Sequence, residues 1–370
     1  MRIIPVRSKQ DQKKFIDLPY HIYKKDTVWV PPLRSEITKQ FNPIHNPFLN
    51  HCRYELFLLE QKGKIIGRIA AFVDDLAVDF WQVPIGLFGY FETVPNPEAA
   101  NILLNTAEEW LQSKHMKKMR GPWSFVSQEW GSVVEGFNPE PVVMSPYNPP
   151  IYNDFYSQFG LKKVKDLLVY QIDCSQSFEV PDRIILLTEK IRKRYGITTR
   201  ILNMKALDKE VEKIIALSND SLIQNWGYSP VTDDEVRAIV NDLKQIIQPK
   251  GVIFAEDQNG IAVGFAIAIP DINVLLKTMK GKIFPFGWIK LFYGIPKISQ
   301  YRMFALGVIP SFHGKGIDGL LYKALYDSLY SKDMRMEINY VLEDNYPMNN
   351  AILKLGAKPF RRYRVFEKEI

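Results

Sequence analysis

The chain has 370 residues, 46% of them hydrophobic, so it is too apolar to be disordered and long enough for two domains. Its two cysteines, Cys52 and Cys174, exclude a disulfide framework; because it shows neither a signal peptide nor about 20 consecutive apolar residues, we expect a cytoplasmic protein. The formal net charge of +7 favours an anionic partner, which a phosphate-bearing cofactor, a nucleic acid or an acidic membrane surface would each satisfy.

Strands and helices alternate along the first half of the chain. Residues 57–74 predict two paired strands around a turn, and residues 87–92 predict a further strand. The pair Asn96-Pro97 is typical of a helix start, and the apolar residues between Ala100 and Leu111 share one face of that helix. Another strand is expected from Lys118 onward. The pattern indicates an α/β unit.

The second half repeats this succession. Thr232 and Glu235 have the spacing of a capping box and predict a helix of about four turns that extends to Ile247. Residues 254–271 predict a strand hairpin, and residues 303–309 predict the strand after it. A helix with its apolar face between Leu321 and Leu329 and a strand over residues 336–342 complete a second α/β unit.

The two halves share residues at a nearly constant spacing. Five residues of the first hairpin, Phe57, Gly63, Gly67, Ala71 and Asp74, recur as Phe254, Gly260, Gly264, Ala268 and Asp271, an offset of 197 (254 − 57). The segment Phe159 to Lys162 likewise resembles Leu355 to Lys358, at an offset of 196 (355 − 159). Two motifs about a hundred residues apart that shift together indicate duplication of a whole domain. We therefore expect domains at residues 1–175 and 176–370, with an insertion at residues 273–297.

A glycine-rich loop, residues 310–319, lies between the strand 303–309 and the helix that follows it. Its glycines leave backbone N–H groups unobstructed at a helix N-terminus, where the helix dipole favours a bound phosphate, and Lys315 adds a cation. On composition alone, a flexible surface turn that opens an ordinary helix is the better interpretation, because short glycine patterns are common. The loop is neither a Walker loop nor the six-residue dinucleotide fingerprint.

The run from Leu306 to Ile317 resembles motif A of the GNAT superfamily of acyl-CoA N-acyltransferases, in which a strand ending in apolar-x-Val-x-Pro precedes Gln/Arg-x-x-Gly-x-Gly/Ala. His313, Gly316 and Asp318 stand at the three anchor positions, so the first and third depart from the motif. Downstream, Asn345 and the Lys-Leu-Gly run that ends at Gly356 match the family, whereas Ile352 replaces its usual tyrosine.

This resemblance implies an α/β fold (α+β, with a mixed sheet) of two tandem GNAT-like domains, each a mixed, mostly antiparallel sheet flanked by helices. It implies direct transfer of an acetyl or longer acyl group from acyl-CoA to a primary amine, without a metal. The first domain is degenerate, since residues 93–97 replace the glycine-rich loop, and it either shapes the acceptor site or only completes the core. The residues implied to bind acyl-CoA are Leu306, Gly307, Val308, His313, Gly314, Lys315, Gly316, Ile317, Asp318, Gly319 and Asn345.

Transfer from a thioester to an amine requires a proton acceptor for the amine and a proton donor for the departing thiolate. Candidates follow the strand 336–342: Glu343 could draw the amine proton through water, and Tyr346 or Tyr340 could protonate the thiolate. Acidic residues after a strand also commonly cap the next helix, and Asp344 or Asn345 could serve that purpose here.

The insertion at residues 273–297 mixes five lysines with aromatic residues and leucines. That mixture suits a peripheral contact with the inner face of the membrane, a cover over a long apolar substrate, or a packed lid with solvated lysines. Bacterial enzymes that N-acylate long-chain amines also resemble GNAT proteins, so the acceptor is expected to be a small-molecule amine or a lipid-like amine.

A different class of function stays open: a non-catalytic CoA-sensing or nucleic-acid-binding module, as the basic cluster at residues 114–120 allows. No nucleic-acid motif accompanies that cluster, and basic residues near the end of a helix are favourable on their own, so nucleic acid is disfavoured. The five histidines are scattered without ligand spacing, and no metal is expected.

Overall fold

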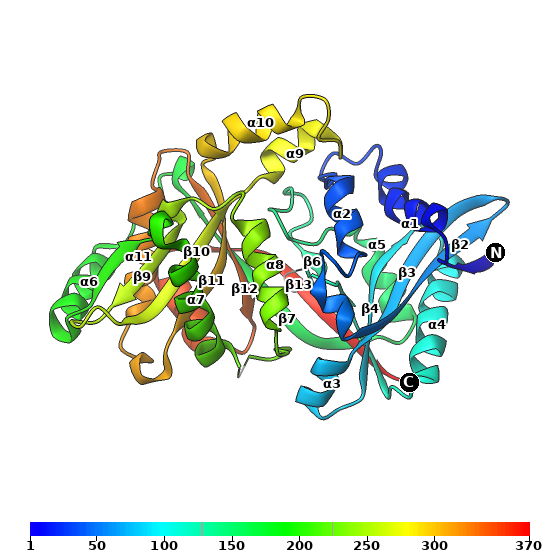
Figure 1. Ribbon diagram of the computed structural model, residues 1–370, viewed down its shortest axis with the longest axis horizontal. Coiled ribbons are helices and arrows are strands. Elements are labelled where there is room, and N and C mark those ends of the chain that lie inside the picture. Colours follow the sequence, from blue (N-terminus) through cyan, green and yellow to red (C-terminus); the bar gives the residue numbers. More distant parts are fainter. Residues whose placement is uncertain (127–128, 224) are drawn as a thin grey trace.

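The two halves of the chain form two lobes that share one continuous sheet (Figure 1). The structure, a computed structural model, describes residues 1–126, 129–223 and 225–370. The strands are β1 (Arg2–Pro5), β2 (Cys52–Gln61), β3 (Lys64–Asp74), β4 (Ile85–Thr93), β5 (Lys118–Trp123), β6 (Ser132–Glu135), β7 (Lys162–Asp173), β8 (Thr198–Ile201), β9 (Val252–Glu256), β10 (Ala262–Pro270), β11 (Gln300–Val308), β12 (Arg335–Leu342) and β13 (Lys358–Glu369). The helices are α1 (Lys9–Ile22), α2 (Arg34–Gln40), α3 (Asp75–Trp81), α4 (Pro97–Ser113), α5 (Ile151–Gln158), α6 (Asp182–Tyr195), α7 (Leu207–Leu222), α8 (Asp233–Leu243), α9 (Asn273–Met279), α10 (Gly287–Gly294), α11 (Ile317–Leu329) and α12 (Tyr346–Lys354).

The last strand of each half lies between the two lobes. The strand order is β1-β2-β3-β4-β5-β13-β7-β12-β11-β10-β9-β8, and β6 pairs with β13 at the side. The C-terminal strand β13 therefore pairs with β5 of the first half, and β7 of the first half pairs with β12 of the second. A cut near residue 175 divides the chain but not the sheet, because each half contributes a strand to the other.

The pairing of β7 with β13 brings equivalent positions of the internal repeat opposite one another. Leu167 lies opposite Tyr363, and these two positions are related by the repeat offset of 196 (363 − 167). On either side of this pair, Lys162 lies opposite Glu367 and Gln171 lies opposite Lys358. The repeat offset relates these two pairs to each other, because it takes Lys162 to Lys358 (162 + 196 = 358) and Gln171 to Glu367 (171 + 196 = 367). The two halves are thus related by a pseudo-twofold axis at Leu167 and Tyr363.

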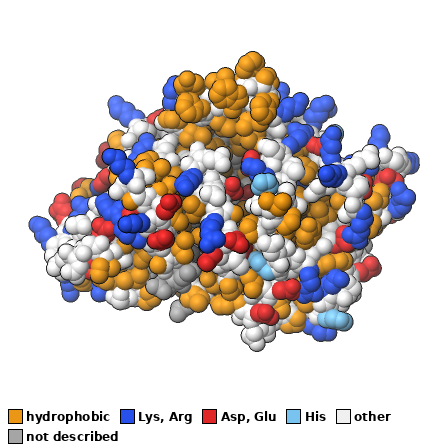
Figure 2. All heavy atoms as spheres, in the orientation of Figure 1, with side chains coloured by type: hydrophobic (Ala, Val, Ile, Leu, Met, Phe, Trp, Pro, Cys, Tyr) orange, Lys and Arg blue, Asp and Glu red, His pale blue; other side chains and the backbone are white. Residues whose placement is uncertain are grey.

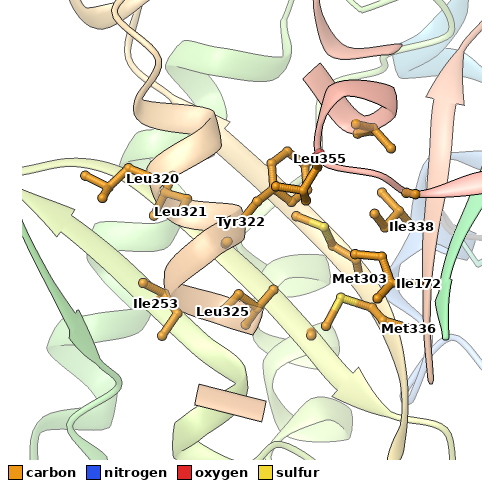
Figure 3. Packing of buried hydrophobic residues seen from close by; sticks show 14 of the residues in the cluster. Ile172, Ile253, Met303, Leu320, Leu321, Tyr322, Leu325, Met336, Ile338 and Leu355 are labelled. Carbon is orange, nitrogen blue, oxygen red and sulfur yellow. The ribbon is translucent and has the colours of Figure 1, made fainter. Parts of the chain in front are cut away.

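Helices cover both faces of the sheet in each lobe. In the second half, α11 buries Leu320, Leu321 and Leu325 against Met303 of β11 and Ile338 of β12 (Figure 3). The equivalent helix of the first half, α4, buries the predicted apolar face from Ala100 to Leu111. On the opposite face, α1 packs in the first lobe and α7 and α8 pack in the second.

Helix α8 has the predicted capping box but is shorter than predicted. The Thr232 side chain accepts from the backbone N–H of Glu235, whose carboxylate in turn accepts from Thr232. The helix ends at Leu243 rather than Ile247, although the N–H of Ile247 still bonds to the Leu243 carbonyl. Pro249 follows closely, and the region before a proline disfavours helical geometry.

Within the described ranges, no helix is long and apolar enough to cross a bilayer.

Candidate active site

Strands β11 and β12 run in parallel and then separate. Their last paired residues are Met303 and Ile338. Directly after this pair, Phe304 is left without a partner in the β10 to β11 register, and β12 shifts its own register against β7 between Ile338 and Val341. A bulge bends its strand and redirects the residues beyond it, so the two irregularities open a gap between the strand ends.

Backbone N–H groups of β11 face this gap. The N–H of Ile309 donates to the Val263 carbonyl, 3.0 Å away, on the β10 side. Since neighbouring residues of a strand direct their N–H groups to opposite sides, the N–H of Gly307 also points toward β10, whereas those of Leu306 and Val308 point into the gap. Two donors therefore line the open side of the strand.

The glycine-rich loop connects the end of β11 to the start of helix α11, where the row of backbone N–H donors continues. Gly314 and Gly316 have φ values of 72° and 78°, in the left-handed region that favours glycine. His313 holds the loop to the strand, because its Nε2 donates to the Val308 carbonyl at 2.7 Å, and Lys315 lies 4.3 Å over the ring of Phe312. Gly316 is the N-cap of α11, and no side chain caps this helix. The N–H groups of its first turn are left without a helical acceptor.

The three glycines of the loop differ in the space around them. A Cβ on Gly316 would lie 2.6 Å from Cδ1 of Ile191 in α6, so the tip of that side chain would have to shift to admit it. A Cβ on Gly314 or Gly319 would meet no atom of the described chain within 4 Å. Asp318 lies in the first turn of α11 beside these open positions.

The first half has the same geometry, but its own side chains satisfy the donors. Thr93 pairs with Gly67 as Val308 pairs with Gly264, and Gly67 and Gly264 are equivalent positions of the repeat (264 − 67 = 197). Thr93 N–H donates to the Tyr152 hydroxyl at 2.9 Å, whereas Asn96 caps α4 by accepting from Glu98 and Ala99. Side chains therefore bond these donors in the first half, whereas in the described second half no side chain caps the equivalent helix.

Two known proteins are similar to this chain over nearly its whole length. No protein-family model matches the sequence. Bacterial ceramide synthase of Caulobacter vibrioides is 31% identical over 381 residues, which cover 100% of this chain and 98% of that protein. Protein YghO of Escherichia coli is 30% identical and covers 98% of this chain and 94% of its own length.

Solved structures share the fold over the whole chain. A tandem GNAT protein from the clavulanic acid biosynthesis pathway superposes with a TM-score of 0.57, at 13% identity, over 100% of this chain and 98% of its own. A GCN5-related N-acetyltransferase from Sphaerobacter thermophilus gives 0.55, at 13% identity, over 100% and 96%. The chain belongs to one family with the two sequence relatives, and it has the fold of tandem GNAT proteins. It is an acyl-transferring enzyme, and the predicted fold class is confirmed.

The proton carriers proposed from the sequence occupy three different environments in the structure. The Glu343 carboxylate bonds to Lys163 at 2.6 Å and accepts the backbone N–H of Asp166 at 2.9 Å. Tyr346 is 70% exposed at the start of α12. Tyr340 is half-buried with its hydroxyl oxygen enclosed, and this burial raises the pKa of the hydroxyl; its ring lies against Trp130, 6.2 Å away between centroids. The structure does not bring the three together.

Asn345 and Ile352 belong to the downstream part of the motif, and the structure shows a structural role for each. The Asn345 side chain accepts from the N–H of Met348 and so caps α12. Ile352 is fully buried in the core of the second half, at the position where the family commonly has a tyrosine. Any hydroxyl that protonates the leaving thiolate must therefore come from another position.

Sequence reasoning missed a buried charge cluster beside the gap. Glu337 of β12 pairs in register with Arg302 of β11, one residue before the strands separate. Burial raises the pKa of Glu337 to about 7, against the partial effect of Arg361, whose Nη1 lies 3.9 Å from its carboxylate. Asp271, at the end of β10, has its pKa raised by burial to about 6. The sequence feature that could have revealed this cluster is the presence of charged residues within otherwise apolar strand segments.

A loop from the first half closes over this cluster. Residues 136–148, here called the strap, follow β6, and the equivalent connection in the second half spans residues 343–345 alone. Arg361 donates to the carbonyls of Gly136 and Pro139, at 3.0 and 2.6 Å. Asp271 accepts the N–H of Val143 at 2.8 Å.

Two further contacts hold the strap. Arg302 donates to the Val143 carbonyl at 2.8 Å, and Asn339 donates to the Ser145 hydroxyl at 3.1 Å. A cavity of about 10 Å³ beside Arg361, large enough for about one water molecule, lies under the strap. The first half thus covers the face of the second half on which Glu337 lies.

Proposed function

We propose that this GNAT protein binds acyl-CoA in its second half alone and transfers the acyl group to the amine of a lipid-like acceptor, a long-chain amine. The observation that carries the proposal is the contrast between the halves. In the described part of the chain, Val308 N–H points into the gap and no side chain caps α11, whereas Thr93 N–H and the first turn of α4 are bonded within the chain. Free N–H groups at a helix N-terminus favour a pyrophosphate.

Each part of the second-half site has a distinct proposed task. The loop from His313 to Gly319 would hold the pyrophosphate, with Lys315 as its cation. The N–H groups of Leu306 and Val308 would bind the pantetheine arm or polarise the thioester carbonyl, where negative charge develops during attack. Gly307 would leave room for the arm, since it has no side chain. Asn345 would keep α12 in place below the loop.

The reaction needs no covalent enzyme intermediate. The amine nitrogen attacks the thioester carbon, the C–S bond breaks, the amine loses a proton and the thiolate gains one. Glu337 is the structural candidate for the proton acceptor, because it lies next to the gap and burial holds its pKa near neutrality. Glu343 stays a candidate from the sequence, although it is already bonded to Lys163. Tyr340 or Tyr346 would protonate the thiolate.

The acceptor would reach the gap from the strap side, since CoA occupies the loop side. Residues 136–148 must then move away from Arg361 and Asp271 for an amine to approach Glu337. The lipid-like acceptor rests on the family relative that is a ceramide synthase by name, and on the apolar insertion that adjoins the strap.

Release of free CoA thiol, measured with acetyl-CoA and with a long-chain acyl-CoA, tests this function. We expect thiol release to depend on a long-chain primary amine and to be much slower with a short one. The N-acylated product should be seen by mass spectrometry. CoA binding without any amine-dependent thiol release, across short and long acyl groups, would contradict the enzyme and favour a CoA-sensing module.

A further inference from the structure

The insertion between β10 and β11 exposes an unusual number of large apolar side chains. Helices α9 and α10 form the top of the molecule in Figure 1, and Figure 2 shows an apolar cluster there with basic residues at its sides. Five side chains of the insertion are between 54% and 78% exposed: Phe284, Phe286, Trp288, Phe292 and Tyr293. Exposed apolar patches of this kind mark contact surfaces.

One side of the insertion is fixed to the body of the protein. Leu276 and Met279 of α9 pack against Val30 and Leu33 of the first half. The N–H of Arg34 donates to the carbonyl of Gly281, 3.3 Å away. The insertion is therefore a rigid platform, and the exposure of its aromatic side chains does not come from a loose end.

The other side of the insertion is made by α10 and the residues before it. No side chain of α10 is buried. Leu291 and Leu275 join α10 to α9: Leu291 packs in the small core of the insertion, and Leu275 lies against Gly294. Trp288 and Phe292, one turn apart on α10, stay exposed. These are the features of an amphipathic helix whose outer face covers no other described part of the chain.

The charge of the insertion is of one sign. Residues 273–299 contain five lysines and no aspartate or glutamate. Lys277 is bound to Glu140, and Lys290 donates to Thr278 at 2.6 Å. Lys280, Lys282 and Lys297 are exposed, and basic side chains lie beside the apolar cluster in Figure 2. A cationic rim around exposed aromatic rings complements a lipid surface with anionic headgroups.

We propose that the outer face of α10 and residues 280–286 dock the protein on an anionic lipid surface, with the aromatic rings at the headgroup level and the lysines on the phosphates. This inference goes beyond acyl transfer and does not depend on it. Docking would place the strap, which bonds to Asn273 through the Pro141 carbonyl at 2.8 Å, next to the membrane. An acceptor could then pass from the lipid surface to the strap side of the gap.

Position along β11 separates this surface from the CoA loop. The insertion rejoins the sheet at Gln300, and the loop begins after Val308, eight residues further along β11. At about 3.3 Å per residue, the two ends of the strand lie roughly 26 Å apart. Substitutions on the patch should therefore leave CoA binding unchanged, which separates a failure of this inference from a failure of the proposed function.

Sedimentation with vesicles tests the docking surface. We expect the full chain to sediment with phosphatidylcholine vesicles that contain phosphatidylglycerol, much less with phosphatidylcholine alone, and to be released by salt. Phe286→Ser with Phe292→Ser should weaken binding at least about tenfold for each ring. Lys280→Glu with Lys282→Glu should weaken it about fivefold for each charge reversed.

Matched controls use exposed residues outside the patch. Ile44→Ser with Leu186→Ser removes two exposed apolar side chains, and Lys205→Glu with Lys209→Glu reverses two exposed charges. Both pairs should retain vesicle binding. Loss of binding in the controls, equal binding to neutral vesicles, or no binding by the wild type would overturn the proposal. So would a dimer, seen by analytical ultracentrifugation, that the aromatic variant dissociates, because a second copy would then be the occupant.

Discussion

The Tyr152 hydroxyl lies 2.9 Å from the backbone nitrogen of Thr93 and occupies, in the first half, the place where acyl-CoA would bind the N–H of Val308 in the second. The same hydroxyl is 2.9 Å from the Thr93 carbonyl and 3.1 Å from the carboxylate of Glu92. A buried hydroxyl with this many partners is costly to displace. The first half therefore retains the fold of a GNAT unit with its gap closed by its own side chain.

The first prediction places a charge in the open space of the loop. Gly319→Glu adds a carboxylate to the first turn of α11, where the Cβ meets no described atom, so the fold should tolerate it. The stabilisation by CoA, about 2.7 kcal/mol at a hundredfold excess over Kd, should disappear in a thermal-shift assay because the carboxylate repels the pyrophosphate. Gly319→Gln, of the same size but neutral, should retain most of it. Equal losses in both variants would indicate a steric effect and remove the electrostatic argument.

The second prediction concerns Asp318, the residue that departs from the motif. Its carboxylate lies in the first turn of α11, close to the predicted pyrophosphate. Asp318→Asn should tighten CoA binding by about two- to fivefold, the range of one charge at a helix terminus. Isothermal titration at low ionic strength should show the gain, and it should shrink as salt is added. Weaker binding by the Asn variant would mean that Asp318 helps to hold the cofactor.

The third prediction uses the cap of the first-half helix. Asn96→Ala removes the acceptor for two backbone N–H groups, those of Glu98 and Ala99. The free energy of unfolding should fall by about 1 kcal/mol, as measured by urea denaturation. The CoA dissociation constant should not change, since this helix end is not a cofactor site. Stronger CoA binding, or a second binding event, would show that the first half has a latent site.

The fourth prediction concerns the pH dependence of stability. The pKa of buried Glu337 is raised from 4.5 to about 7, so the native state holds the proton to higher pH than the unfolded chain. Between these values the native state binds more protons, and this group lowers the free energy of unfolding as pH rises. Gln resembles the protonated side chain, so Tm of Glu337→Gln relative to wild type should increase from pH 5 to pH 8. A difference in Tm that is flat across this range would show that the side chain is not buried as described.

The same substitution tests the proposed proton acceptor. Wild-type acyl transfer should slow as pH falls below about 7, where Glu337 becomes protonated, and Glu337→Gln should reduce kcat by about a hundredfold or more. Glu92 is the matched control: burial raises its pKa to about 7 as well, but it lies in the first half. Glu92→Gln should leave kcat unchanged. If it lowers kcat as much as Glu337→Gln does, the loss follows from folding and Glu337 has no special part in the reaction.

Local sequence patterns predicted much of the fold because they act over short distances. The hairpin repeat, the capping box at Thr232 and the Asn96-Pro97 helix start all recur in the structure as expected. Strand exchange could not be read in this way, because nothing in β13 itself states that its partner is β5, more than two hundred residues away. The duplication offset says only which positions are equivalent, and the structure shows that the equivalent strands pair symmetrically about Leu167 and Tyr363.

The candidate site also has a part that local sequence patterns predict and a part that they do not. The loop at His313 to Gly319 is a contiguous motif, so the sequence sufficed to find it, whereas the role of each residue in it stays a prediction. The cluster of Glu337, Arg302 and Arg361 comes together from three strands, and the strap that covers it comes from the other half. Contacts of this range depend on the assembled sheet and have no local signature.

The stoichiometry of CoA binding by isothermal titration tests the central claim most directly, because the two halves share a fold and differ in which backbone donors are free. The account predicts one CoA per chain for the wild type and for Asn96→Ala, and none for Gly319→Glu. Two sites per chain, or one site that Gly319→Glu leaves intact, would contradict it.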